Sequence, residues 1–446
     1  MTPVNLWPDR HHLGPVTDLY QLTMMAGYAA SGMADKAATF ELFVRRLPQG
    51  RAYLVFAGLE QAIGDLVRLA FSNEQAEYLR ALPAFAHVPD EFFTTLPDLR
   101  FQGDVWSMPE GTVVFPGETL LRVEAPLAQA QWVETFLIAS LNYPTLVATK
   151  AARIVEAAEG RPCVDFGARR GHGPHAGFLA ARASYLAGFA GTSHVEAARL
   201  LGIPPFGTMA HSWVQAFGDE AAAFSAFARV FPQNSTLLVD TYDTLEGTRR
   251  AAAIEPPIQA IRIDSGDLGT LAKEARTILD AADRRGTTIL ASSDLDEWKI
   301  AELLRDGAPI DAFGVGTELI TSRDAPALSM VYKLVAIDGH GRVKLSPGKR
   351  SYPLAKQVFR ATDGQGRFAG DHVARWDEAV SGEPLLSRVV AAGRIVGELP
   401  SLDAIRERCR RQLAALPDSL RGPDSVGTYP ISYSDALEHE AAALGL

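Results

Sequence analysis

Short apolar runs alternate with longer amphipathic segments through the middle of the chain. From Pro162 onward each run is followed by a polar cluster and then by residues with the spacing of a helix. This alternation predicts parallel strands in a sheet or barrel, with polar side chains gathered at the carboxyl ends of the strands. The predicted strands are Cys163–Val164, Leu186–Phe189, Ile203–Phe206, Leu237–Val239, Ala260–Ile263, Thr288–Ala291 and Ala312–Val315.

The residues before this region follow a different pattern. A helix is predicted from a cap at Thr17 or Asp18 to Tyr28, then a strand over Thr39–Leu47. Residues 54–100 have helical spacing, 101–126 read as strands with turns, and Ala128–Ala158 is a long helical segment interrupted by Pro144. The predicted parts are an N-terminal α+β portion at 1–145, an α/β barrel at 146–345, and a C-terminal portion at 346–446 that packs back on the first.

Two features stand out after the last predicted strand of the barrel. The cations Lys344, Lys349, Arg350, Lys356 and Arg360 predict a basic loop. An Arg-rich helix is predicted around Asp403–Leu416.

Composition limits the possible partners and compartments. The 446 residues carry a formal net charge of −10, which argues against nucleic acid or an anionic membrane as the main partner. The two cysteines offer neither a disulfide framework nor a zinc spacing. No signal peptide is visible, and no apolar run approaches the roughly 18 residues of a membrane span. A cytoplasmic protein is expected.

The turn that follows the fifth predicted strand, Asp264-Ser265-Gly266-Asp267, suits a sugar phosphate. Its glycine lets the backbone approach a ligand, and the following helix offers N–H groups to a phosphate. Its carboxylates can hold hydroxyl groups and Mg²⁺. The plainer interpretation is an aspartate cap on an ordinary barrel helix.

Further candidates follow other predicted strands. Gly314 and Gly316 form a second glycine turn before Thr317, which with Arg262 nearby favours a phosphorylated ligand. His211 follows small residues and suits a general base, a metal ligand, a covalent nucleophile or a buried structural histidine.

Phe166 and Arg169 suit a flat anionic ring, since an aromatic side chain stacks and a guanidinium pairs with a carboxylate. Tyr20 can supply another face only if its helix reaches a barrel mouth.

Several blocks in order carry a resemblance to a known family. They are Thr17-Asp18-Leu19-Tyr20-Gln21, Phe40-Glu41-Leu42-Phe43, Pro109-Glu110-Gly111, Asp165-Phe166-Gly167-Ala168-Arg169-Arg170, Gly207-Thr208-Met209-Ala210-His211-Ser212, Arg262-Ile263-Asp264-Ser265-Gly266-Asp267, Gly316-Thr317 and Val331-Tyr332-Lys333-Leu334-Val335. With these blocks the chain resembles the nicotinate phosphoribosyltransferases from about residue 17 to about residue 360, and its last 80 or so residues match loosely.

The resemblance implies a type II phosphoribosyltransferase, with an irregular TIM-like α/β barrel and an α/β sandwich domain built from both ends of the chain. Such enzymes transfer the phosphoribosyl group of phosphoribosyl pyrophosphate (PRPP) to nicotinate, giving nicotinate mononucleotide and pyrophosphate, the first step of NAD synthesis from nicotinate. The reaction is coupled to hydrolysis of ATP, a co-substrate, through a phosphohistidine, and is classed with the ligases. The resemblance further implies Mg²⁺ and a homodimer, with Tyr20, Arg45 and Arg46 reaching the neighbour's barrel.

The resemblance also assigns roles by position. The catalytic residues are then His211 (the phosphohistidine), Asp240 (a partner of His211 or of the sugar) and Arg169. Nicotinate is then held by Tyr20, Phe166, Arg169, Ser193, Thr208 and Arg262. PRPP is then held by Asp264, Ser265, Gly266, Asp267, Gly314, Gly316 and Thr317, with Mg²⁺ near Asp264 and Asp267.

Ser193 bears on the choice of ring. Related nicotinamide-using enzymes carry an aspartate at what looks like this place, and a carboxylate there would repel nicotinate. Nicotinamide and quinolinate remain alternative substrates. A non-catalytic nucleotide-binding barrel remains a rival from another class, and a Schiff-base aldolase is disfavoured because the predicted strand ends carry no lysine.

Overall fold

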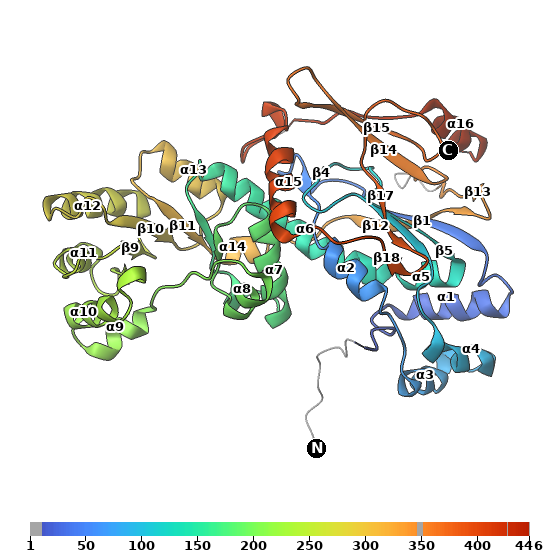
Figure 1. Cartoon of the computed structure of the whole chain (residues 1–446), viewed down its shortest axis with the longest axis horizontal. Coiled ribbons are helices and arrows are strands. Elements are labelled where there is room, and N and C mark those ends of the chain that lie inside the picture. Colours follow the sequence, from blue (N-terminus) through green and yellow to red (C-terminus); the bar gives the residue numbers. More distant parts are fainter. Residues whose placement is uncertain (1–10, 346–350, 426, 446) are drawn as a thin grey trace. The chain divides into compact units, whose positions relative to one another are not determined.

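The computed structural model describes residues 11–345, 351–425 and 427–445, and it consists of two compact units (Figure 1). The first unit takes chain from both ends, namely Met1–Thr145, Ala327–Arg421 and Ser425–Leu446. The second unit comprises Leu146–Pro326 and the short segment Gly422–Asp424. The sequence predicted three parts at 1–145, 146–345 and 346–446, and that division stays a prediction.

The first unit is built on a seven-stranded antiparallel sheet with the order β13-β12-β1-β5-β3-β17-β18. Its central strand β1 pairs on both edges, and Leu42 and Val44 in it are fully buried. Helices α1 and α5 contact each other, and α5 packs against β1 and β5. The strands are β1 (Ala37–Val44), β3 (Asp104–Ser107), β5 (Leu121–Pro126), β12 (Met330–Ile337), β13 (His340–Gly341), β17 (Ser387–Ala391) and β18 (Arg394–Ile395).

Smaller sheets and the remaining helices complete the first unit. Four strands form the order β16-β14-β15-β19, and β2 pairs with β4. These strands are β2 (Leu54–Val55), β4 (Val113–Val114), β14 (Lys356–Thr362), β15 (Phe368–Arg375), β16 (Glu383–Pro384) and β19 (Ile431–Tyr433). The helices are α1 (Leu19–Ala30), α2 (Leu59–Leu66), α3 (Asn73–Arg80), α4 (Asp90–Thr95), α5 (Leu127–Trp132), α15 (Leu402–Ala414) and α16 (Asp435–Ala443).

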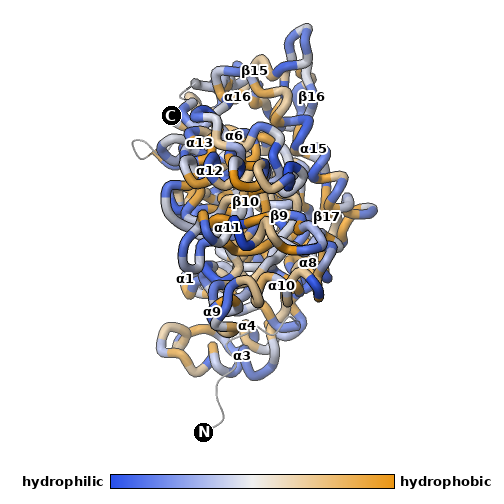
Figure 2. Tube along the Cα trace, turned by 90° about the vertical axis from the view of Figure 1, so that its left-hand side faces the viewer, coloured by the Kyte–Doolittle hydropathy of each residue, from blue (hydrophilic) through white to orange (hydrophobic). Residues whose placement is uncertain are grey.

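The second unit is built on a six-stranded parallel sheet with the order β7-β6-β11-β10-β9-β8. Its strands are β6 (Cys163–Asp165), β7 (Gly191–Thr192), β8 (Thr236–Leu238), β9 (Ala260–Ile263), β10 (Thr288–Ser292) and β11 (Ala312–Val315). Hydrophobic residues run along β9 and β10 (Figure 2), where Ile261 and Ile289 are fully buried. The helices are α7 (Pro174–Leu186), α8 (Val195–Leu201), α9 (His211–Phe217), α10 (Glu220–Val230), α11 (Thr244–Ala252), α12 (Leu268–Ala281), α13 (Glu297–Arg305) and α14 (Thr317–Ile320), and α6 (Glu134–Ala157) begins in the first unit.

Aspartates start four helices of the second unit. The side chains of Asp219, Asp243, Asp267 and Asp296 accept hydrogen bonds from backbone N–H groups in the first turns of α10, α11, α12 and α13. An acidic cap pairs N–H groups that have no partner within the helix and complements the helix dipole. Acids in the connections that lead into these helices therefore have a structural role besides any chemical one.

The expected barrel is not closed in the described part of the chain, because β7 and β8 are the two end strands of an open sheet and do not pair with each other. Two predicted strands were wrong. Leu186 ends helix α7 instead of starting a strand, and Ile203–Phe206 makes only an isolated bridge between Pro205 and Thr192. Pro204 and Pro205 explain the second miss, since proline has no N–H to donate to a ladder. The sandwich description of the first unit stays a prediction.

The basic loop expected near residue 350 was also wrong in part. Lys356 and Arg360 lie in strand β14 and are buried, where they pair with Glu41 and Asp371. Lys349 and Arg350 lie outside the described residues. Pro144 lies inside α6 without ending it. No helix of the described ranges combines the length and apolar character that a membrane crossing requires.

The segment Gly422–Asp424 is tied into the second unit by two hydrogen bonds. Nη2 of Arg153 donates to the Pro423 carbonyl oxygen at 2.8 Å, and the Trp298 indole N–H donates to Oδ1 of Asp424 at 3.0 Å. Arg153 and Lys150 of α6 share Glu297, at N–O distances of 2.8 and 2.6 Å. This buried ion cluster thus joins α6, α13 and a piece of chain that arrives from the C-terminal part.

Candidate active site

Parallel pairing of β9 with β10 brings the centre of the site together. Arg262 pairs in register with Leu290, and because side chains alternate along a strand, Asp264 and Ser292 extend from the same face two residues further on. Arg262 Nε donates to Ser292 Oγ at 2.9 Å and Nη1 donates to Thr208 Oγ1 at 3.0 Å. Nη2 forms an ion pair of 3.1 Å with Asp264 Oδ1. The guanidinium is therefore fixed from three sides.

Asp264 and Asp240 form the acidic part of this network. Ser292 Oγ donates to Asp264 Oδ1 at 2.5 Å, while the Asp264 backbone N–H donates to Asp240 Oδ2 at 3.0 Å. Ser265 Oγ also donates to Asp240 Oδ2, at 2.5 Å. Within the described residues, Oδ1 of Asp240 is buried and has no hydrogen-bond partner. Asp240 therefore supports the turn at Asp264 and Ser265, and it leaves one carboxylate oxygen available for a ligand.

His211 is the first residue of α9 and is 40% exposed. Its Nδ1 lies 3.2 Å from Thr241 Oγ1, and its Nε2 lies 4.0 Å from Asp264 Oδ2, beyond hydrogen-bond length. The contacts of the imidazole are thus with Thr241 and Asp264 instead of the expected Asp240. The ring keeps access to solvent, as a group that reacts with a substrate must.

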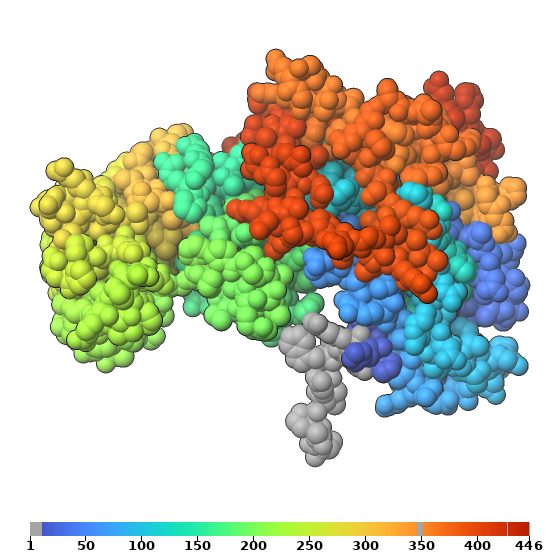
Figure 3. Space-filling model, viewed as in Figure 1, coloured from blue at the N-terminus to red at the C-terminus, as the bar shows by residue number. Residues whose placement is uncertain are grey.

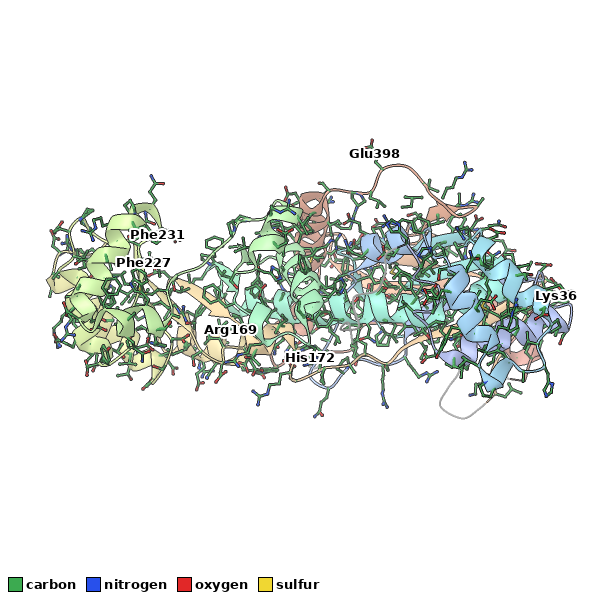
Figure 4. The ribbon with its side chains drawn as sticks, turned by 90° about the horizontal axis from the view of Figure 1, so that it is seen from below. Lys36, Arg169, His172, Phe227, Phe231 and Glu398 are labelled. Atoms are coloured by element: carbon green, nitrogen blue, oxygen red, sulfur yellow. The ribbon has the colours of Figure 1, made fainter. Side chains whose placement is uncertain are left out.

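Helix α10 holds α9 in place. The Trp213 indole N–H donates to the Ala223 carbonyl oxygen at 3.1 Å, and the Trp213 ring meets Phe227 edge-on at 5.8 Å between centroids. Phe227 of α10 and Phe231, the residue just after that helix, lie together (Figure 4), with ring centroids 4.8 Å apart. Both helices form part of the surface of the second unit (Figure 3). The role of Trp213 is therefore packing.

Phe166 lies beside the Arg262 guanidinium, whose carbon is 5.6 Å from the ring centroid. Glycine at 314 makes room for this ring, because a Cβ there would lie 2.4 Å from a ring carbon of Phe166. The Phe166 N–H donates to the Val315 carbonyl oxygen at 2.8 Å, which anchors the residue to β11. A flat aromatic face and a guanidinium thus stand next to each other.

The fully buried carboxylate of Asp165 supports the backbone around this ring. It accepts from the Gly167 N–H and from Thr192 Oγ1, each at 2.7 Å, and the Asp165 carbonyl accepts from the Ser193 N–H at 2.8 Å. Burial raises the pKa of Asp165, and these two hydrogen bonds to the carboxylate partly oppose that effect. Asp165 therefore links the loops that carry Phe166 and Ser193.

The remaining turn residues lie at helix starts. Both oxygens of Asp267 bond Thr270, from its N–H at 3.2 Å and its hydroxyl at 2.7 Å. These Thr270 hydrogen bonds lower the pKa of Asp267. Gly266 takes φ +81°, a conformation that favours glycine. Gly316 and Thr317 begin α14. Asp267 is thus a cap, the plainer of the two interpretations of this turn.

Two expected nicotinate ligands make none of the hydrogen bonds or ion pairs described for this network. Arg169 is exposed on the short 3₁₀ turn Ala168–Arg170 (Figure 4). Tyr20 belongs to the first unit and is 48% exposed. Their substrate contacts stay predictions.

Ser292 and Thr241 are the network residues that sequence reasoning missed. Each stood in a polar cluster after a predicted strand, but serine and threonine at such positions are common in turns and caps.

The carboxylates of the site can be compared with the ligands that a divalent cation requires. Among residues 11–345, 351–425 and 427–445, no three His, Cys, Asp or Glu side chains are grouped so as to hold a metal. Mg²⁺ commonly uses one or two carboxylates together with substrate phosphates and water. The unpartnered Oδ1 of Asp240, next to Asp264, fits that arrangement. Asp267 fits less well, because both of its oxygens are engaged.

Comparison with known proteins assigns the chain along most of its length. The nicotinate phosphoribosyltransferase (NAPRTase) N-terminal domain matches residues 16–142, the NAPRTase family matches 162–351, and the C-terminal domain matches 378–440. Nicotinate phosphoribosyltransferase pncB2 of Mycobacterium tuberculosis (strain ATCC 25618 / H37Rv) is 48% identical over 444 residues, which cover 98% of this chain and 95% of that protein.

Two further relatives agree with this assignment. The Bacillus subtilis nicotinate phosphoribosyltransferase is 43% identical over 384 residues, covering 83% of this chain and 78% of that protein. The crystal structure of human nicotinic acid phosphoribosyltransferase has a TM-score of 0.84 and 29% identity, covering 97% of this chain and 100% of that one. The chain therefore belongs to the nicotinate phosphoribosyltransferase family.

Proposed function

We propose that the protein transfers the phosphoribosyl group of PRPP to nicotinate, giving nicotinate mononucleotide and pyrophosphate. The observation that carries this proposal is the network of Arg262, Ser292, Asp264 and Asp240, with the Phe166 ring on one side and His211 on the other. Relatives named for this activity over nearly the whole chain support it.

The two ends of the network suit the two substrates. Phe166 can stack on the pyridine ring, and Arg262 can donate to its carboxylate. Asp264, Asp240 and the turn through Ser265 and Gly266 can hold the ribose hydroxyls and the diphosphate. Mg²⁺ bound at Asp240 and Asp264 would neutralise charge on the departing pyrophosphate.

The chemistry requires orientation more than proton transfer. The nitrogen of nicotinate is already a nucleophile at neutral pH, so no residue has to remove a proton from it. It attacks the ribosyl carbon, the bond from that carbon to pyrophosphate breaks, and positive charge builds on the sugar in between. The carboxylates near the sugar stabilise that charge, and a fixed ring supplies the alignment, a contribution of about 7 kcal/mol in favourable cases.

ATP coupling is the further part of the proposal. His211 accepts the γ-phosphoryl group of ATP, ADP departs, and water later hydrolyses the N–P bond to release phosphate. The partial exposure of His211 and its closeness to Asp264 support this role. A phosphoryl group at His211 would add negative charge beside the diphosphate site, which ties its formation to the arrangement of the bound substrates.

The expected homodimer extends this proposal. Tyr20, on the exposed side of α1, would then close the nicotinate site of a second copy, and Arg45 and Arg46 would reach the barrel of that copy together with it. Light scattering on the active enzyme is the measurement, with a dimer as the expected result. An active monomer would contradict it.

The deciding experiment compares three substrates. We expect product from nicotinate with PRPP, and much less from nicotinamide or quinolinate, with a higher rate when ATP is present. His211→Ala should remove the effect of ATP. Equal or greater product from quinolinate would contradict the assignment, and full ATP-coupled turnover by His211→Ala would contradict the phosphohistidine.

A further inference from the structure

We propose that Ser292 is a positioning residue that orients both Arg262 and Asp264 for the transfer, an inference that rests on the proposed function. Ser292 is the last residue of β10 and is only 3% exposed. It does not belong to any set of residues expected to bind nicotinate or PRPP. Its hydroxyl is nevertheless the one group that bonds directly to both the cation and the anion at the centre of the network.

The hydroxyl of Ser292 both accepts and donates a hydrogen bond, and the direction of each bond is fixed. It accepts from Arg262 Nε at 2.9 Å and donates to Asp264 Oδ1 at 2.5 Å. A serine hydroxyl has a single proton, so an ionised Asp264, which can only accept, determines which way that proton points. The Arg262 Nε–H is then directed at the free side of the same oxygen. One oxygen atom thereby sets the orientation of two charged groups.

Counting donors shows what this leaves for a substrate. A guanidinium has five N–H groups. Nε–H bonds Ser292, and the two N–H groups of Nη1 face Thr208 Oγ1 at 3.0 Å and the Met209 carbonyl oxygen at 3.4 Å. The N–H groups of Nη2, whose nitrogen forms the 3.1 Å ion pair with Asp264, are therefore the ones left to donate to a ring carboxylate. Ser292 helps to decide where they point, because it fixes Nε of the same rigid guanidinium.

Asp264 is arranged by the same hydroxyl. With Oδ1 engaged by Ser292 and Arg262, Oδ2 is the oxygen that faces His211 at 4.0 Å. Loss of the Ser292 hydroxyl would free Arg262 Nε and let the carboxylate turn about its Cβ–Cγ bond. The nicotinate side and the diphosphate side of the site would then lose their alignment together.

A structural role alone is the rival explanation, and the same sheet offers a matched control. Ser235 is 1% exposed and precedes β8 at the opposite, amino-terminal end of the strands. Its hydroxyl also donates and accepts, to the Pro232 carbonyl oxygen at 3.3 Å and from the Gln259 N–H at 3.0 Å. Ser235→Ala and Ser292→Ala remove equivalent buried hydroxyls, so a purely structural loss would affect both alike.

The experiment measures KM for nicotinate, KM for PRPP, kcat and the melting temperature of Ser292→Ala, Ser292→Thr and Ser235→Ala. We expect both alanine variants to melt lower than wild type, but only Ser292→Ala to lose kcat/KM, by about tenfold or more for nicotinate. The hydroxyl restored in Ser292→Thr should recover most of that loss. Equal kinetic constants in the two alanine variants would overturn the proposal.

A double-mutant cycle tests whether Ser292 acts on kcat/KM through Arg262. If Ser292 acts through Arg262, Ser292→Ala should add little to the loss in kcat/KM for nicotinate already caused by Arg262→Lys, because lysine has no Nε–H group in that position. Fully additive losses would overturn the proposal. Wild-type protein that makes no nicotinate mononucleotide would overturn the proposed function and this inference with it, an outcome distinct from an active wild type with unaffected Ser292→Ala.

Discussion

At the scale of single residues, the hydroxyl of Thr241 is the neighbour that steadies His211. Its Oγ1 lies 3.2 Å from Nδ1 of the imidazole, and no acid stands at that nitrogen among the contacts of the described residues. For the proposed phosphorylation of His211, a neutral partner has the advantage that it adds no second negative charge next to Asp264.

Thr241→Val tests this contact with a side chain of the same shape. Loss of one hydrogen bond of about 1 kcal/mol should reduce the stimulation by ATP about fivefold, and the rate without ATP should stay close to wild type. Paired rate measurements with and without ATP are the check. Thr277→Val, on the exposed side of α12, is the control. Unchanged stimulation in Thr241→Val would show that the contact has no role in coupling.

Ser193 is the residue at which ring specificity can be tested. Its backbone N–H is tied to the Asp165 carbonyl oxygen at 2.8 Å, so a new side chain at this position starts from a fixed backbone. Ser193→Asp should lower kcat/KM for nicotinate relative to nicotinamide by about tenfold, because two carboxylates repel each other in a partly buried site. The uncharged Ser193→Asn separates charge from size. A ratio that does not change in Ser193→Asp would remove Ser193 from the account of specificity.

At the scale of secondary-structure elements, strand β11 packs against the Phe166 ring through Gly314. Gly314→Ala would place a Cβ 2.4 and 2.5 Å from two ring carbons, so the ring has to move. Overpacking of this kind costs about 1–3 kcal/mol. We expect a higher KM for nicotinate and a lower melting temperature, both measured against Gly286→Ala, where a Cβ meets no atom within 4 Å. A normal KM in Gly314→Ala would mean that the position of Phe166 does not matter for binding.

The elements that could be predicted from sequence are those in which burial and local preference agree. Ala260–Ile263 is apolar except for Arg262, Ala312–Val315 is apolar throughout, and each run ends in a polar turn. Both are strands with the predicted bounds. Ile203–Phe206 has a similar apolar content, but its two prolines prevent a ladder. Leu186 continues the pattern of the helix before it, and periodicity alone did not separate the end of that helix from a new strand.

The residues of the site could be predicted better than the contacts between them. Arg262, Asp264 and His211 were recognisable by residue type and position after strands. The pairing of Arg262 with Leu290 fixes which residues of neighbouring strands share a face, and no pattern within one strand reveals that register. This is why Ser292 was overlooked and why the partner of Asp240 was left open between His211 and the sugar.

At the scale of the whole molecule, the first unit encloses an acidic group that should make stability depend on pH. Glu118 is fully buried beside Arg360 and Asp371. Burial raises the pKa of Glu118 well above its ordinary value of 4.5, and the hydrogen bond and charge of Asp371 raise it further. The folded chain therefore holds a proton on Glu118 at a pH where the unfolded chain has released it.

Proton linkage gives the direction in which stability changes with pH. The stability contribution of this group is complete below pH 4.5 and is lost as pH rises through the elevated pKa of the folded state. Glu118→Gln, which mimics the protonated acid, should therefore gain stability relative to wild type as pH rises from about 5 to about 9. Urea midpoints across this range are the measurement, with the exposed Glu398→Gln (Figure 4) as control. A constant difference at every pH would contradict the prediction.

The short stretch Gly422–Asp424 limits how the protein can be divided. Its Pro423 carbonyl and Asp424 carboxylate receive hydrogen bonds from Arg153 and Trp298, yet the residues on either side of it are part of the first unit. A gene fragment for residues 146–326 would thus encode the network around Arg262 but lack this tripeptide, which binds Arg153 and Trp298 of the same unit. Anyone wishing to shorten this enzyme would have to graft that tripeptide back, or redesign the two side chains that depend on it.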